Sequence, residues 1–177
     1  MTKALALAAA VAAASVASAG CGAISFDVSQ SVPEQEVPGS PLGGLLPSFL
    51  PQPFPVTIDV EQETAKRSTG PARSANLKSV KFEITPHDAP SGNFDFVDEI
   101  HIFVAPASSS GSSLPSVEIA NLQPVPQGQT TISLTIVPGV DLLPYINAGA
   151  SISATASGHS PPATVTYDGT VTVTIHI

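Results

Sequence analysis

Apolar and polar residues alternate with period two in several separate stretches of this chain, and this alternation restricts the fold more than any other feature. Successive side chains of a β-strand point to opposite faces, so such a stretch predicts a strand with one buried face. The clearest stretch is 170–177, where Val171, Val173, Ile175 and Ile177 share one face. Similar patterns predict strands over residues 24–32, 56–61, 80–85, 100–105, 116–120, 131–136 and 151–157.

Turn-forming residues separate these stretches, and helix signals between them are short. The pair Asp168-Gly169 predicts a hairpin, because both central residues of a type I′ turn need positive φ. One helical turn is expected around residues 63–67, and a second over 141–147 with Asp141 as its cap. Without long helices between the strands, parallel βαβ units are excluded. We therefore predict an all-β fold, an antiparallel β-sandwich of about seven to nine strands that is Ig-like only in its architecture.

A proline-rich segment interrupts the pattern near the N-terminus. Residues 33–55 hold seven prolines, which neither a regular helix nor an interior strand accommodates. Six large apolar side chains lie in the same segment: Leu42, Leu45, Leu46, Phe49, Leu50 and Phe54. We expect them to pack on the domain, and the alternative is that they contact a membrane or a partner.

The first 21 residues have the composition of an export signal. Lys3 precedes an unbroken apolar run from Ala4 to Ala14, and small residues then lead to Cys21. The run is too short for a stable membrane span. The stretch 15–21 resembles the signal of bacterial lipoproteins, in which the cysteine after the small residues becomes diacylated. The rest of the chain is similar in layout to the uncharacterised β-sandwich domains that such lipoproteins carry.

This resemblance implies a lipid anchor on Cys21 and a location in the bacterial cell envelope, facing the periplasm or the exterior. The expected parts are a signal peptide (1–20), a lipid-attached N-terminus (21–55) and a β-sandwich domain (56–177). The alternative is ordinary cleavage after Ala19, which releases a secreted soluble protein. We favour the anchor because Cys21 is the only cysteine in the chain, and a free exposed thiol is a liability in an oxidising compartment.

Charge and aromatic content exclude nucleic acid as a partner. The chain has a formal net charge of -8, no Trp and only two Tyr. An acidic protein repels the phosphate backbone, and bases need aromatic platforms on which to stack.

No stretch predicts a catalytic residue or a cofactor. Ser110-Gly111 and Gly158-His159-Ser160 lack the strained serine elbow of hydrolases, and the histidines lack the close spacing of zinc sites. Asp95, Asp98 and Glu99 form a calcium candidate, because three carboxylates at the mouth of a strand offer oxygen ligands. A solvated acidic loop is the simpler interpretation of the same residues.

We therefore expect an envelope protein whose sandwich is a binding or structural module. Loops 106–114 and 158–164 are the expected contact regions for a protein or glycan partner. The alternative function is a calcium-dependent or enzymatic module that uses the acidic cluster.

Overall fold

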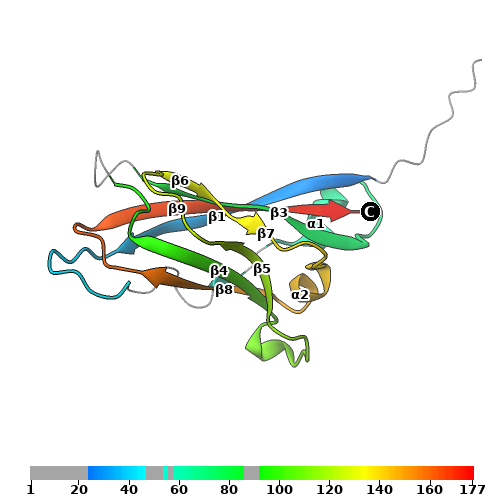
Figure 1. Cartoon of the computed structure of the whole chain (residues 1–177). Coiled ribbons are helices and arrows are strands. Elements are labelled where there is room, and N and C mark those ends of the chain that lie inside the picture. Colours follow the sequence, from blue (N-terminus) through cyan, green and yellow to red (C-terminus); the bar gives the residue numbers. More distant parts are fainter. Residues whose placement is uncertain (1–23, 47–53, 56–57, 86–91) are drawn as a thin grey trace, which may run out of the picture.

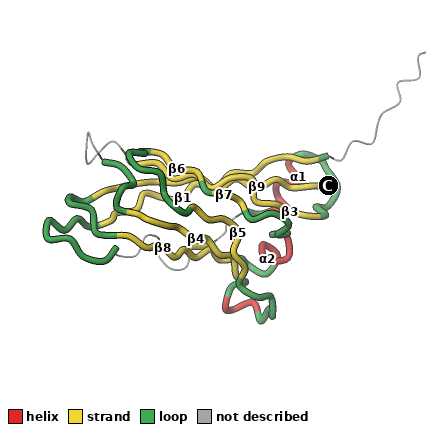
Figure 2. The backbone as a smooth tube through the Cα atoms, viewed as in Figure 1, coloured by secondary structure: helices red, strands yellow, loops and turns green. Residues whose placement is uncertain are grey.

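The computed structural model describes residues 24–46, 54–55, 58–85 and 92–177. In these described residues, nine strands form two antiparallel sheets, and the sheets pack face to face (Figures 1 and 2). In the first sheet the strands lie in the order β1 (Ser25–Val37), β9 (Val165–His176), β3 (Ser74–Ile84), β6 (Thr131–Ser133). In the second sheet the order is β2 (Phe54–Pro55), β8 (Ser151–Gly158), β4 (Val97–Ala105), β5 (Val117–Leu122), β7 (Thr135–Ile136). The predicted antiparallel β-sandwich is confirmed.

Strand β9 lies between β1 and β3 and pairs with both along most of its length. Its inward residues Val171, Val173 and Ile175 are buried, and Ile177 is partly buried against the same core. The predicted orientation of residues 170–177 is confirmed. The core therefore includes the aliphatic face of this strand.

The predicted hairpin at Asp168-Gly169 is wrong, because β9 continues through both residues. Gly169 pairs with Val32 on one side and Phe82 on the other. A Cβ atom on Gly169 would lie 2.7 Å from the Phe82 ring. The glycine therefore makes room for a core aromatic ring rather than for a turn.

Strand β1 is longer than the predicted 24–32 and passes through Pro33. It is an edge strand of the first sheet, where a missing backbone N–H is tolerated. The register with β9 shifts between Val32 and Gln35, so a bulge accommodates the proline. Residues 25–37 thus belong to the sandwich.

The strand predicted over 56–61 is wrong from Ile58 onward. Helix α1 (Val60–Lys66) begins two residues later and contains most of the helical turn expected around residues 63–67. Asp59 Oδ1 accepts a hydrogen bond of 2.8 Å from the Gln62 N–H at its start. Ile58 and Val60 are buried as the alternation implied. The capping aspartate and the acidic first turn stabilise a helix instead.

The second predicted helix is α2 (Leu143–Asn147). Leu142 rather than Asp141 occupies the position that precedes the helix. Asp141 Oδ1 accepts hydrogen bonds from the N–H of Leu143, at 3.0 Å, and of Ala75, at 2.9 Å. One carboxylate thus ties the start of α2 to β3.

The two ends of the sandwich are formed by different segments of the chain (Figure 1). Residues 24–28, 58–78, 140–147 and 172–177 form one end, which we call the α1 end. Residues 38–46, 92–96, 126–130 and 158–164 form the opposite end, which we call the loop end.

An aromatic cluster lies beneath the loop end. The Tyr167 ring packs in T-shaped contacts with Phe82 and Phe94, with 5.7 Å and 6.0 Å between ring centroids. Burial raises the pKa of the Tyr167 phenol far above its ordinary value. The cluster gives the loops a rigid, apolar base.

Val173→Asp and Thr172→Asp test the orientation of β9. Val173 is 2% exposed, so a carboxylate there lies in the core, and we expect a loss on the order of 4 kcal/mol in the free energy of unfolding. Thr172 faces outward and shares an exposed hydrogen bond with Ser29, so its replacement is expected to cost about 1 kcal/mol or less. Urea unfolding of both variants measures the difference. Equal losses would contradict this register.

Candidate functional site

A surface cleft of about 310 Å³ opens at the loop end. Its walls come from residues 92–96 and 159–165, which are more than 60 positions apart in the chain. Polar Asn93, Asp95 and Thr164 line it together with Phe96 and two prolines. This volume lies at the lower end of the range of small-molecule sites, about 300–1,000 Å³.

Two glycines allow the walls of the cleft to form. Gly158 has φ +151°, and a Cβ there would lie 2.2 Å from the Phe96 carbonyl oxygen. A Cβ on Gly39 would lie 2.2 Å from the carbonyl carbon of Ala163. The backbones approach too closely for any side chain, so these positions require glycine.

Asp95 holds one wall of the cleft in place. Its Oδ2 accepts a 2.8 Å hydrogen bond from the Asn93 amide, and its Oδ1 accepts one from the Gly128 N–H. Asn93 Oδ1 in turn accepts from the Asp95 N–H at 3.1 Å. The carboxylate therefore joins the loop to the neighbouring turn.

The three carboxylates of the calcium candidate, Asp95, Asp98 and Glu99, do not form a metal site in the described residues. Asp98 and Glu99 are consecutive in β4 at a register shift between β4 and β8, and both lie between the buried residues Val97 and Ile100. Asp98 is exposed, whereas Glu99 lies 3.9 Å from Nε2 of His101. Among the described residues, no three His, Cys, Asp or Glu side chains are grouped to hold a metal ion.

A hydrogen-bonded network that the sequence analysis missed lies on the outer face of the second sheet. His101 Nδ1 donates to Glu118 Oε1 at 2.6 Å, and the Asn121 amide donates to the same oxygen at 3.1 Å. The Phe103 ring stacks on the imidazole, with 6.5 Å between centroids. The bond from His101 and then that from Asn121 hold the pKa of the Glu118 carboxyl below its ordinary value.

A β-bulge brings Glu118 to this face. The register between β4 and β5 shifts at Ile102/Phe103, which sets Ile102 opposite Ala120 and Phe103 opposite Glu118. Ile119 and Ala120 are consequently both buried. Simple alternation predicts opposite faces for these two neighbours, so no local sequence signal marks the network.

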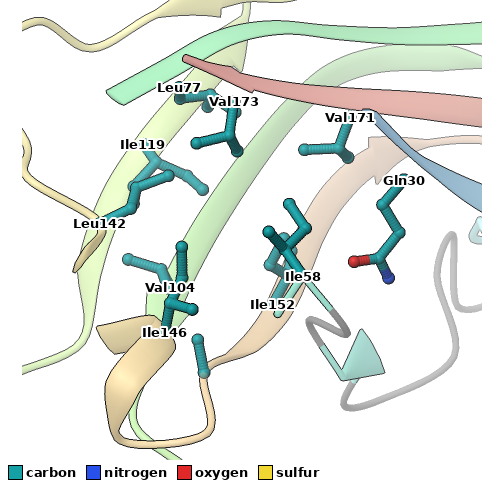
Figure 3. A pocket seen from close by; sticks show the side chains of 11 residues that line it. Gln30, Ile58, Leu77, Val104, Ile119, Leu142, Ile146, Ile152, Val171 and Val173 are labelled. Atoms are coloured by element: carbon teal, nitrogen blue, oxygen red, sulfur yellow. The ribbon is translucent and has the colours of Figure 1, made fainter. Parts of the chain in front are cut away.

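An apolar cavity lies between the two sheets (Figure 3). Aliphatic side chains from both sheets and from α2 surround it, and Gln30 supplies a polar group at one side. Its volume is about 20 Å³, room for about one water molecule. The cavity is therefore a packing defect and not a ligand site.

The two predicted contact loops lie far from each other. Residues 158–164 form one wall of the cleft at the loop end. Residues 106–114 follow the other end of β4 and contain the 3₁₀ turn Ser108–Ser110. The Ser110 hydroxyl donates to the Ala107 carbonyl at 2.7 Å, so it has a structural role in this turn.

The expected packing of the proline-rich segment holds only in part. Leu46 packs against the core, but Leu42 and Leu45 are 97% and 90% exposed at the loop end. Backbone hydrogen bonds from Ser40 to Pro161 and from Ser160 to Gly44 hold this segment beside the cleft. Phe49, Leu50 and Cys21 lie outside the described residues. No helix in the described part of the chain is long and apolar enough to cross a membrane.

Comparisons with known proteins identify no family. No family model matches the chain, and no curated protein matches it significantly. One similar solved structure is the decameric BFDV capsid protein, at 10% sequence identity and a TM-score of 0.36. The match covers 87% of this chain and 99% of that chain, but so low a TM-score supports no conclusion.

The Glu118 network predicts a pH dependence of stability. The folded-state pKa of Glu118 lies below 4.5, so the network adds stability that is complete above this unfolded value and is lost as the pH falls through the folded value. Glu118→Gln is therefore expected to destabilise the protein near neutrality and to lose this effect in acid. Urea unfolding over a pH series measures it, with exposed Glu34→Gln as the charge control. A pH-independent difference would contradict the assignment.

The cavity predicts that added volume is tolerated on its lining. Val104 lines the cavity, so Val104→Ile is expected to raise the free energy of unfolding by about 0.5 kcal/mol or more. Val80 is equally buried but does not line the cavity, so Val80→Ile is expected to cost about 1–3 kcal/mol by overpacking. Thermal melting compares the two. Destabilisation by both would show that the space is already filled.

Proposed function

We propose that this chain is an exported protein of the bacterial cell envelope, held in a membrane by acyl chains on Cys21. One observation carries the proposal: the only cysteine of the chain directly follows an apolar run and a series of small residues. More than one acyl chain on this residue holds a protein firmly, whereas a single chain gives marginal attachment. The folded sandwich begins only a few residues later, since β1 starts at Ser25.

We infer that the sandwich acts as a binding module for a protein or glycan, with the loop end as its contact surface. The cleft between residues 92–96 and 159–165 supports this assignment, because its lining combines apolar residues with the polar side chains of Asn93, Asp95 and Thr164. Leu42 and Leu45 add exposed apolar surface beside it. Loops on a rigid scaffold are common binding surfaces.

Cys21→Ser tests the anchor. The wild type is expected to fractionate with membranes and to yield a mature N-terminus at Cys21 whose mass includes acyl groups. The variant is expected to lose both the membrane association and the added mass. Intact-mass spectrometry of both fractions provides the measurement. An unmodified wild-type protein that begins at Gly20 in the soluble fraction would establish ordinary cleavage after Ala19 instead.

A further inference from the structure

We propose that the α1 end of the sandwich rests on phospholipid headgroups, so that the sandwich stands on the bilayer with its loop end away from it. This orientation depends on the proposed anchor at Cys21. It adds a second contact with the membrane, made by side chains of the folded domain.

The distance along the chain brings the α1 end close to the anchor. Only three peptide units separate Cys21 from Ile24, so their Cα atoms are at most about 11 Å apart. The Ile24 carbonyl accepts a 2.9 Å hydrogen bond from the Ile177 N–H, and Ser25 pairs with His176. Ile24, the described residue nearest the anchor, is therefore fixed at the α1 end.

The basic side chains gather at this same end. The described residues contain five Lys and Arg, of which four lie at the α1 end: Lys66, Arg67, Arg73 and Lys78. The side chains of Lys66 and Lys78 are each 56% exposed, and that of Arg67 is 37% exposed. Arg67 also lies over the Phe26 ring, 4.2 Å from its centroid, which joins α1 to the start of β1.

The two ends of the sandwich differ in their number of cations and not in their net charge. At the α1 end the four cations face five carboxylates, a net charge of -1. Lys81 belongs to neither end, and the loop end carries one carboxylate, Asp95, and no Lys or Arg, so its net charge is also -1. Lys66 and Arg67 form ion pairs with Glu63, and Lys78 forms one with Asp27, but these side chains remain 37–56% exposed. A headgroup phosphate therefore finds exposed cations at the α1 end and none at the loop end.

The apolar surface at the α1 end suits the headgroup region as well. Ile24 is 57% exposed at the point where the chain leaves the sandwich towards Cys21. Long Lys and Arg side chains around such a residue place their alkyl stems on apolar surface and their charges among phosphates. A bilayer surface, already close to this end because of the anchor, fits both features.

Site-specific fluorescence quenching tests the orientation on the full-length lipidated protein. Acylation blocks the only native thiol, so Ala65→Cys at the α1 end and Leu42→Cys at the loop end each provide a single labelling site. Both positions are exposed. In phosphatidylcholine vesicles with phosphatidylglycerol and a headgroup quencher, we expect the label at Ala65 to be quenched several-fold more than the label at Leu42. Equal quenching, or stronger quenching at Leu42, would overturn the orientation.

Charge-removing variants test the role of the cations. The double variant Lys66→Gln/Arg73→Gln is expected to reduce the quenching at Ala65. The single variants Lys81→Gln and Glu83→Gln, which lie outside the α1 end, should leave the quenching unchanged. The same loss with Lys81→Gln would show a general charge effect and overturn the specific contact. Wild-type protein that remains unmodified and free of the vesicles would overturn the anchor and the orientation together. Bound protein with equal quenching would overturn the orientation alone.

Discussion

The first sheet depends on the pairing of β9 with two partners. Its residues form ladders with β1 on one side and β3 on the other, and these join the N-terminal strand to the centre of the chain. The same strand contributes Tyr167 to the aromatic cluster and Val173 to the aliphatic core. Both contributions require an uninterrupted strand, which Gly169 permits by leaving space for the Phe82 ring. A turn at this position would have separated the two halves of the core.

Period-two alternation predicted the sandwich and most strands because it reports burial, which is the main determinant of a strand's orientation. It failed where a local interaction or a distant neighbour had more influence. At Val60 the alternation is real, but the Asp59 cap stabilises a helix. At Gly169 a glycine is required because the Phe82 ring, which is distant in the sequence, packs closely against it. These errors have a common cause: the pattern shows which residues are buried, not which backbone conformation buries them.

The candidate cleft was less predictable than the fold. The loop 158–164 was expected as a contact region from its turn residues, but its neighbour across the cleft comes from residues 92–96, and only the pairing of β4 with β8 brings them together. Asp95 was proposed as a calcium ligand on the basis of nearby acids in the sequence. In the folded chain it accepts hydrogen bonds from Asn93 and Gly128. Residue types that ligate metals are also those that stabilise loops, and sequence alone does not separate the two roles.

Strand β1 connects the proposed anchor to the proposed binding surface. It extends from Ser25 at the α1 end to Val37 at the loop end, and 13 residues at about 3.3 Å each span about 40 Å. Its pairing with β9 makes this span rigid, unlike a flexible linker of the same length. In the proposed orientation, the cleft is therefore held at a fixed height above the headgroups. A partner that binds there must itself reach about 40 Å from the membrane surface, which favours a partner that projects from the envelope.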